Sequence, residues 1–394
     1  MMEFRILKRS PKSHARLGTF KTPHGMVETP AFVGVATQAV VKTLTSEEVL
    51  TTSTQILIAN TFHPHLKPSE NVVAKNGGLH AFMNWRHPLM TDSGGFQIFS
   101  LGFGADLETG KILKQKRDIV ISKHSTPRHV TITGEGALFR SPVDGKELFI
   151  GPQESMKIQE KLGADIMFAF DECTSPVADH AYNKKALKRT HEWARICLKT
   201  HRTNQALFGI VQGGKFKDLR VQSARFIGAL PFDGFGIGGE FGNSKKTMIS
   251  MLQWTIAHLP SEKPRHLLGI GHLEDILPII KEGVDLFDCI TPTHYARHGY
   301  AFVRKARRGT LRTKNTFDWK YKKLDMGKTK YLSDKSPLDP ACDCFVCQHY
   351  TRSYISHLTR AKEITALKLL TFHNLRCFNG YVENIRRMVG RGLI

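Results

Sequence analysis

The 394-residue sequence contains no long apolar run. No segment approaches the roughly 20 apolar residues that a membrane-spanning helix requires, and residues 1–9 carry no apolar stretch long enough for a signal peptide. These absences argue against a secreted or membrane-embedded protein. We therefore expect the chain to act in the cytoplasm.

Cysteine is scarce, with seven residues in all. An odd total that includes a tight group of three does not suggest a disulfide framework. Cys342, Cys344 and Cys347 form a Cys-x-Cys-x-x-Cys motif, whose loop can bring three thiolates to one cation. We interpret this motif as a metal site, because three cysteines this close seldom serve packing alone.

Such a site needs a fourth ligand. His349 is too close to Cys347 for comfortable loop geometry, whereas His373 lies in an apolar helical context that can hold an imidazole over the loop. A closed site with three sulfurs and one nitrogen predicts structural zinc, with no open position for water. The candidates are His349, His357, His373 and Cys377.

Acidic residues are also in short supply. The chain has 35 Asp and Glu against 57 Lys and Arg, a net charge of +22, which favours a polyanionic substrate or partner. Basic residues concentrate in 304–330 and again in 111–128. A solvated surface is the alternative for either run alone. Aromatic residues lie among the first run and could stack on bases: Phe317, Trp319, Tyr321 and Tyr331.

The sequence does contain eight short apolar segments that alternate with stretches of helical periodicity. This alternation predicts a (β/α)8 barrel, an α/β fold whose parallel strands all end on one face. The predicted strands are 30–35, 55–60, 87–92, 165–171, 206–211, 232–237, 265–270 and 284–290. The predicted helices are 46–52, which follows a possible capping box from Thr45 to Glu48, and 152–162, 181–201, 218–230, 245–258 and 273–282.

Two regions interrupt the alternation. The gap between Asp92 and Asp165 is too long for one crossover and contains β-rich segments, so we expect an antiparallel β insertion near 102–150. The chain also continues well past the last strand. We therefore expect a catalytic barrel over residues 1–299, and a basic, zinc-binding subdomain over 300–394 that packs on the barrel.

Three aspartates stand at or just past predicted strand ends: Asp92, Asp171 and Asp288. In a parallel barrel these positions open onto one mouth, so distant acids would share a pocket. Asp285 competes with Asp288 because it lies on the same strand. Asp171 has an alternative role as the cap of the following helix.

Glycine-rich turns accompany these acids. Ser93 precedes Gly94-Gly95, Gln212 precedes Gly213-Gly214, and a third pair follows residue 237 as Gly238 and Gly239. A missing side chain lets backbone amides approach a planar ligand, and a glutamine amide can both donate to and accept from a base edge. Any one pair alone would suggest a simple turn, but together they predict a flat, narrow slot.

These motifs, at 91–97, 170–174, 211–214 and 283–289 with the cysteine motif and His373, resemble tRNA-guanine transglycosylases in order and spacing across almost the whole chain. The resemblance implies a zinc-bearing barrel that exchanges guanine at the wobble position of GUN-anticodon tRNAs for a 7-deazaguanine base, queuine or preQ1. It also implies a pentosyltransferase that acts as a homodimer.

Carried over residue by residue, the resemblance makes Asp288 the nucleophile that attacks C1′ of the ribose, and Asp92 the general acid and base. It implies a covalent ribosyl-enzyme intermediate and two displacements. It assigns tRNA contacts to Thr293, His294 and Arg297. It assigns base binding to Ser93, Phe96, Asp171, Gln212, Gly238, Gly239, Leu268 and Gly269.

Two segments differ from the bacterial pattern. Bacterial members have Arg where this chain has His294, which weakens the expectation of a permanent positive charge. The loop from Glu240 to Ser244 also differs, and Gly242 falls about where queuine-using enzymes carry glycine. We therefore hypothesise that the enzyme uses queuine in place of, or besides, preQ1.

Two other classes of function remain as alternatives. A noncatalytic tRNA-binding subunit of a heteromeric transglycosylase would need neither Asp92 nor Asp288. A zinc hydrolase or deaminase would need an open metal position and a nearby glutamate. The presence of both aspartates and of a candidate fourth ligand, His373, argues against these alternatives.

Overall fold

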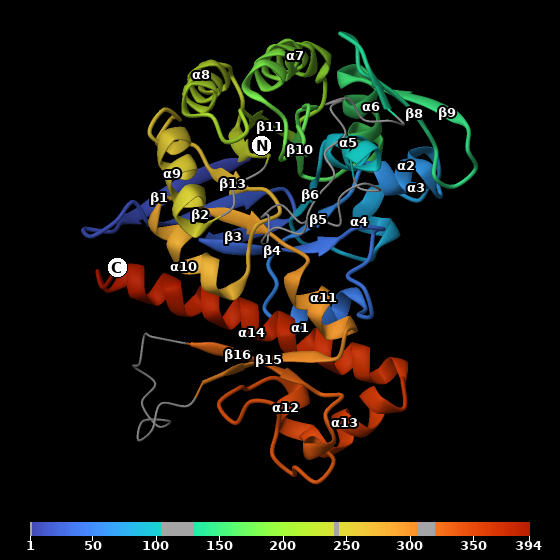
Figure 1. Cartoon of the computed structure of the whole chain (residues 1–394), viewed down its shortest axis with the longest axis vertical. Helices are drawn as coiled ribbons and strands as arrows, with labels where there is room; N and C mark the ends of the chain where they lie inside the picture. Colours follow the sequence, from blue (N-terminus) through green and yellow to red (C-terminus); the bar gives the residue numbers. More distant parts are fainter. Residues whose placement is uncertain (1, 104–129, 240–243, 306–319) are drawn as a thin grey trace.

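The computed structural model describes residues 2–103, 130–239, 244–305 and 320–394. Its centre is a closed barrel of eight parallel strands in the order β10-β11-β12-β13-β14-β4-β5-β6 (Figure 1). The predicted (β/α)8 barrel is confirmed. Its strands are β4 (Ala31–Ala36), β5 (Leu57–Ala59), β6 (Leu89–Thr91), β10 (Ile166–Phe168), β11 (Ala206–Val211), β12 (Gly234–Ile237), β13 (Arg265–Leu267) and β14 (Leu286–Asp288).

Six helices between the strands agree with the predicted ranges to within a few residues. They are α1 (Ser46–Thr51), α6 (Pro152–Leu162), α7 (His180–Thr200), α8 (Lys217–Gly228), α9 (Lys245–Ile256) and α10 (Leu273–Lys281). The capping box at α1 is also present: the Glu48 amide donates to the Thr45 hydroxyl at 3.2 Å, and the Thr45 amide donates to the Glu48 carboxylate at 3.0 Å.

Five described helices of the barrel were not predicted. Three short helices connect β5 to β6, a fourth follows β6, and a fifth follows β14. Short helices of one or two turns carry too few apolar positions for periodicity to reveal them. They are α2 (Phe62–Leu66), α3 (Glu70–Lys75), α4 (Gly78–Phe82), α5 (Gly95–Phe103) and α11 (Thr291–Arg297).

A three-stranded antiparallel sheet closes the barrel at the end where its strands begin. We call it the closing sheet; it comprises β1 (Glu3–Arg9), β2 (Arg16–Thr22) and β3 (Gly25–Thr29). Phe20 and Val27 of this sheet are fully buried in one cluster with the residues that fill the barrel interior. The Phe20 ring meets the Phe208 ring edge-on, with centroids 6.2 Å apart. The opposite end, where the strands finish, is therefore the open mouth.

The expected antiparallel insertion is present between β6 and α6. It forms a three-stranded sheet of β7 (Val130–Ile132), β8 (Ala137–Arg140) and β9 (Glu147–Ile150). The basic run predicted within 111–128 lies outside the described residues.

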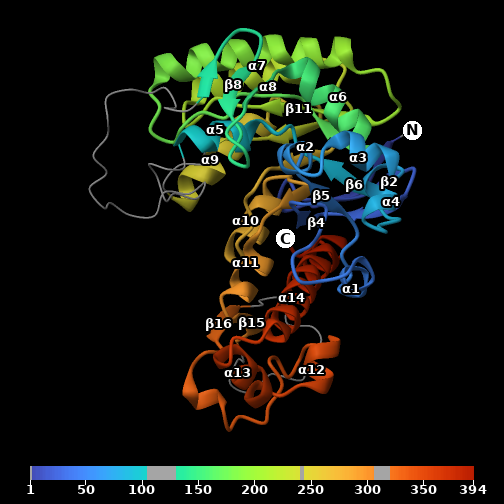
Figure 2. The ribbon, with the colours of Figure 1, turned by 90° about the vertical axis from the view of Figure 1, so that its right-hand side faces the viewer.

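The C-terminal region extends away from the barrel on the side of α14 (Figure 2). It begins with an antiparallel hairpin, continues through two short helices and returns along a 27-residue helix. Within the described ranges, no helix combines the length and apolar composition needed to cross a bilayer. The elements are β15 (Tyr300–Arg304), β16 (Tyr321–Asp325), the 3₁₀ helix η1 (Thr329–Tyr331), α12 (Phe345–His349), α13 (Arg352–Arg360) and α14 (Ile364–Gly390).

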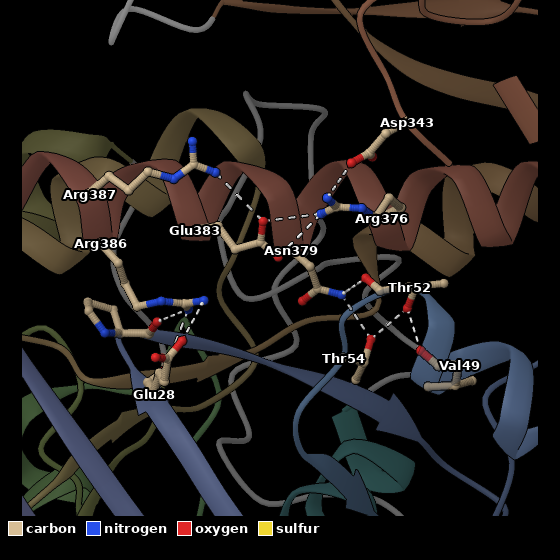
Figure 3. A network of polar contacts seen from close by, with 11 residues as sticks. Glu28, Val49, Thr52, Thr54, Asp343, Arg376, Asn379, Glu383, Arg386 and Arg387 are labelled. Carbon is tan, nitrogen blue, oxygen red and sulfur yellow. Dashed lines mark hydrogen bonds and ion pairs between the residues drawn. The ribbon is translucent and has the colours of Figure 1, made fainter. Parts of the chain in front are cut away.

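Helix α14 fastens this region to the barrel. The Asn379 amide donates to the Thr52 carbonyl and the Thr54 hydroxyl, both at 2.9 Å, and Arg386 pairs with Glu28 of β3 at 3.6 Å (Figure 3). Phe378 packs between Phe32 of β4 and Phe302 of β15. One apolar core therefore runs from the barrel wall into the C-terminal region.

Candidate functional site

The predicted site residues gather at the carboxyl ends of the barrel strands. Asp92 follows β6, Asp171 lies three residues past β10, Gln212 follows β11 directly, and Asp288 is the last residue of β14. Gly238 and Gly239 follow β12, while Leu268 and Gly269 follow β13. In a parallel barrel these positions form one rim. The residues thus lie around a single mouth, although they are spread over 196 positions of sequence from Asp92 to Asp288.

The Asp92 carboxylate is surrounded by donors. Its Oδ1 accepts the Thr61 amide at 2.8 Å and the Gly94 amide at 3.1 Å, while its Oδ2 accepts the side-chain amides of Asn60 and of Gln97, the latter at 3.1 Å. Asn60 and Thr61 come directly after β5, the strand beside β6. The neighbouring strand end therefore fixes the orientation of this carboxylate.

Burial nevertheless raises the pKa of Asp92 to about 6, because the charged form loses more hydration than the hydrogen bonds from Thr61, Gly94, Asn60 and Gln97 restore. The side chain is still partly accessible at the mouth. A carboxyl group with a pKa near neutrality can both give and take a proton at physiological pH. That property suits the acid-base role predicted for Asp92.

Among the described residues, two donors contact one oxygen of Asp288. Its Oδ1 accepts Nε2–H of His266 and the backbone amide of Gly269, each at 2.9 Å. His266 is on the adjacent strand β13 and is fully buried, with its ring 5.3 Å from that of Phe168. The carboxylate of Asp288 is 15% exposed, so it stays accessible from the mouth.

Asp285 points to the other end of the same strand. Its two oxygens accept Nε and an Nη of Arg16 at 2.8 and 2.6 Å, and Oδ2 also accepts the Arg265 amide at 2.8 Å. Both partners of this ion pair are buried, and Arg16 is the first residue of β2 in the closing sheet. The Asp285 carboxylate is therefore saturated with donors and inaccessible from the mouth, which leaves Asp288 as the accessible carboxylate of β14.

Asp171, Ser93 and Gln212 form one polar edge. The Ser93 hydroxyl donates to Asp171 Oδ1 at 2.9 Å, and the Gln212 amide nitrogen donates to Oδ2 at 2.6 Å. The alternative role of Asp171 as a helix cap is wrong, because α7 is capped by Asp179. Gln212 Oε1 is buried and finds no hydrogen-bond partner among the described residues. An unpaired buried acceptor is costly and points to a donor supplied by a ligand.

Glycine is required directly after β12, because the backbone there lies against the Gln212 side chain of the polar edge. A Cβ at Gly238 would lie 2.8 Å from the Gln212 amide nitrogen, and one at Gly239 would lie 2.5 Å from Oε1. Gly239 also has φ +88°, which L side chains rarely adopt. The buried guanidinium of Arg220 ties the two turns together by donating to the Gly214 carbonyl at 2.8 Å and the Gly238 carbonyl at 2.9 Å. The predicted narrow slot is consistent with these contacts.

The remaining predicted residues differ in exposure. Phe96, at the start of α5, is 44% exposed, and Leu268 is partly buried. On α11, His294 is exposed, whereas Thr293 is buried and its hydroxyl donates to the Ile290 carbonyl at 3.2 Å. Arg297 donates to the Thr293 carbonyl at 3.2 Å. Partial desolvation and the neighbouring His298 and Arg297 lower the pKa of His294, which favours the neutral ring.

The basic run at 304–330 is partly described. Lys322 and Lys323 are exposed on β16, and Lys323 Nζ lies 4.1 Å from the centroid of the Tyr295 ring on α11. The stacking role proposed for two aromatics is not supported, because Tyr331 is buried and Tyr321 packs against Tyr381 of α14. Phe317 and Trp319 lie outside the described residues.

Cys342, Cys344, Cys347 and His373 converge on one point with their four ligand atoms within 4.8 Å of one another. His373 Nδ1 lies 3.5 Å from the Cys344 sulfur and 3.3 Å from the Cys347 sulfur. His373 Nε2–H donates to the Phe302 carbonyl at 2.7 Å, which leaves the Nδ1 lone pair facing the thiols. This cluster fits a closed tetrahedral zinc site, and among the candidate fourth ligands His373 occupies the position.

Sequence reasoning missed several residues that hold the two rim aspartates. Asn60, Thr61 and Gln97 surround Asp92, and His266 contacts Asp288. Asn60, Thr61 and His266 lie on or just after the strand next to that of the aspartate, and Gln97 lies in the helix that follows Asp92. The order of the strands around the predicted barrel was the signal that could have located those on neighbouring strands. A polar residue at the end of a strand neighbouring a candidate acid is a natural partner.

A family model described as queuine tRNA-ribosyltransferase matches residues 11–393. The chain belongs to this family. It is 44% identical over 391 residues to the queuine tRNA-ribosyltransferase of Moorella thermoacetica, covering 99% of this chain and 94% of that protein. It is 42% identical over 387 residues to the enzyme of the same name from Halothermothrix orenii, covering 98% and 93%. The relative from Pelotomaculum thermopropionicum is 42% identical over 393 residues, covering 99% and 95%.

Membership identifies the chain as an enzyme, a pentosyltransferase with tRNA-guanine transglycosylase activity. Matches that extend over both the barrel and the C-terminal region agree with the continuous apolar core that joins them.

Proposed function

We propose that this queuine tRNA-ribosyltransferase replaces guanine at the wobble position of GUN-anticodon tRNAs by double displacement at C1′ of the ribose. The observation that carries the proposal is the pair of accessible carboxylates on one rim, Asp92 and Asp288, each oriented by hydrogen-bond donors. Such hydrogen bonds fix the orientation of a carboxylate that stays accessible. That arrangement suits a nucleophile and a proton carrier better than a structural ion pair does.

In the first displacement, a carboxylate oxygen of Asp288 forms a bond to C1′ while the bond from C1′ to N9 of guanine breaks. The pKa of Asp92, about 6, allows it to give a proton to the departing base. The product is a ribosyl ester of Asp288 and free guanine. His266 and Gly269 hold the attacking group in one orientation, which lowers the entropy lost on reaching the transition state.

In the second displacement, Asp92, now ionised, takes the N9 proton of the incoming 7-deazaguanine base. Its N9 then forms a bond to C1′ and the ester bond to Asp288 breaks. Two inversions at one carbon restore the original configuration. The incoming base is queuine or preQ1; Gly242, on which the preference for queuine depends, lies outside the described residues.

The base would be read by the polar edge of Asp171, Ser93 and Gln212. Asp171 accepts N–H groups of the base, and the unpartnered Oε1 of Gln212 accepts another. The backbone around Gly238 and Gly239 closes the slot, and Phe96 and Leu268 cover the two faces of the ring. Binding of a base that lacks these N–H donors would leave buried acceptors without hydrogen bonds, and this cost is a strong source of selectivity.

The other parts of the proposal concern the surroundings of the site. Zn²⁺ would be held by Cys342, Cys344, Cys347 and His373 and would stabilise the C-terminal region without taking part in the reaction. That region, 300–394, and the residues Thr293, His294 and Arg297 of α11 would contact tRNA. A homodimer and a cytoplasmic location complete the proposal, and light scattering of the purified chain tests the first of them.

The decisive experiment traps the ester. The purified chain is mixed with guanine-containing substrate tRNA without an incoming base, denatured, and resolved for a protein–RNA adduct. We expect an adduct whose attachment maps by mass spectrometry to Asp288, and no adduct with Asp288→Asn. Guanine release without any adduct, or attachment at another residue, contradicts the mechanism. Absence of both release and adduct supports the alternative of a noncatalytic tRNA-binding subunit.

A further inference from the structure

A second group of potential metal ligands lies at the closed end of the barrel. It comprises His24 in the turn between β2 and β3, His80 in α4 and Asp165 immediately before β10. One ligand atom from each lies within 4.8 Å of the other two. The group is at the end of the strands opposite the mouth, so it is separate from the residues assigned to base exchange.

Asp165 is fixed before any ligand arrives. Its side chain is 1% exposed, and Oδ2 accepts the Leu89 amide at 3.0 Å. Its backbone amide donates to the Leu89 carbonyl, and its own carbonyl accepts the Ala206 amide, both at 2.9 Å. Asp165 is therefore held by the two strands on either side of β10, with its carboxylate fixed from β6.

His80 presents a lone pair to this carboxylate. Its Nδ1 contacts the Trp85 carbonyl at 2.8 Å, and a carbonyl can only accept, so Nδ1 carries the proton. In the neutral ring Nε2 is then a bare acceptor. Nε2 is buried, has no hydrogen-bond partner among the described residues, and lies 3.6 Å from Asp165 Oδ2. Two acceptors aimed at one point require a cation or a proton between them.

The distance distinguishes a metal from a hydrogen bond. A separation of 3.6 Å is too long for a hydrogen bond, whereas two ligands about 2.1 Å from one tetrahedral cation are about 3.4 Å apart. The Trp85 carbonyl and the Leu89 amide also hold the outer sides of His80 and Asp165, the arrangement that orients ligands in metal sites.

His24 supplies the third ligand. Its Nδ1 donates a hydrogen bond to Asp165 Oδ1 at 2.7 Å, and its ring stacks on that of His80 with centroids 3.6 Å apart. A cation must lie near the plane of each ring, so on metal binding His24 has to give up this hydrogen bond and the Nδ1 proton and turn away from the parallel position before Nδ1 becomes a ligand. Its side chain is 40% exposed in a hairpin turn, which allows that movement.

We propose that His24, His80 and Asp165 form a second metal site, for a divalent transition metal such as Zn²⁺. Two imidazole nitrogens and one carboxylate suit this class of ion rather than Ca²⁺ or Mg²⁺. Water completes the coordination on the exposed side of His24. The bound ion joins the closing sheet to α4 and to the start of β10, so it stabilises the closed end of the barrel.

The test measures metal stoichiometry. The chain is first saturated at its cysteine cluster, dialysed against micromolar free Zn²⁺, and assayed by elemental analysis and calorimetric titration. We expect two equivalents of Zn²⁺ for the unaltered chain and one for His24→Ala and for His80→Gln. In these two variants the affinity of the second site should be at least about tenfold weaker than in the unaltered chain. His24→Ala alters an exposed turn, so it keeps the test valid if His80→Gln folds poorly.

His180→Ala is the matched control, because His180 is an exposed histidine paired with Asp218 at 2.7 Å that belongs to no ligand group among the described residues. It should retain two equivalents. A single equivalent in the unaltered chain, or two equivalents in all variants, overturns the proposal. Co²⁺ added as the second equivalent should give no thiolate charge-transfer absorption, and such absorption would place it at the cysteines instead.

Discussion

Asp285 immediately precedes β14 and Asp288 ends it, and their carboxylates are held in different ways. Asp285 is 0% exposed and meets the positive guanidinium of Arg16, whereas Asp288 is 15% exposed and accepts hydrogen bonds from His266 and the Gly269 amide. At the closed end, the charge is cancelled and buried. At the mouth, the charge is oriented and kept available. Three positions along one strand thus separate a carboxylate that supports the fold from one that suits chemistry.

The largest expected effect lies at the mouth. Asp288→Asn should reduce base exchange by about 10⁴-fold or more, because the nucleophile is lost. Its melting temperature should change little, since the asparagine oxygen still accepts from His266 and Gly269. Turnover of labelled guanine in tRNA and thermal unfolding measure the two quantities. If Asp288→Asn turns over within tenfold of the unaltered chain, Asp288 is not the nucleophile and does not differ from Asp285 in function.

Asp285→Asn should show the reverse pattern. It leaves the buried Arg16 charge uncompensated, so we expect a loss of about 3–5 kcal/mol in the free energy of unfolding. The fraction that remains folded should exchange guanine at the normal rate. Urea denaturation and activity per folded molecule test this. The double variant Arg16→Met/Asp285→Leu removes both charges and should recover much of the stability.

The pKa of Asp92 predicts opposite pH dependences for the two half-reactions. Its pKa of about 6 lies above the ordinary aspartate value of 3.8, so the group stays protonated up to about pH 6. Guanine release needs the protonated form, and its single-turnover rate should fall about tenfold per pH unit above 6. Incorporation of the incoming base needs the ionised form, so its single-turnover rate should rise with pH up to about pH 6. Asp92→Asn should abolish both slopes, and parallel slopes in the two half-reactions would refute the assignment.

The smallest effect concerns His266, which we place as a positioning residue for Asp288. His266→Phe removes a hydrogen bond to a charged group. Such a bond contributes about 1.5–3 kcal/mol, so kcat should fall roughly 10- to 150-fold. KM for tRNA should be unchanged, and the yield of trapped adduct should fall in step with kcat. His266→Gln can still donate and should restore part of the rate. A loss confined to thermal stability would make His266 only a packing residue.

Much of this arrangement was predictable from the sequence because the strand ends carry both the periodic signal and the polar residues. The eight apolar segments and six of the helices were located closely, and Asp92, Asp171, Gln212 and Asp288 fell on one rim as expected. These predictions depend on patterns within about ten residues of sequence, where hydrophobic periodicity is strongest. Their side-chain roles still await the experiments above.

Contacts between distant segments could not be predicted in the same way. The closing sheet depends on Phe20 entering a core built from eight strands, and the His24, His80 and Asp165 group joins positions up to 141 residues apart. Tyr321 and Tyr331 were assigned to stacking because composition alone does not show which side chains the fold covers. Tyr321 packs against Tyr381 of α14, and Tyr331, in η1, is buried.

Helix α14 also determines how the mouth and the basic hairpin β15–β16 lie relative to one another. It carries His373, which faces the three cysteines, in its first half and the barrel anchors Asn379 and Arg386 further along, on one helix about 40 Å long. A continuous helix anchored at both parts does not act as a hinge. An RNA that binds to both the mouth and the hairpin meets a preorganised surface. Its binding therefore costs less entropy than binding to two flexibly joined parts would.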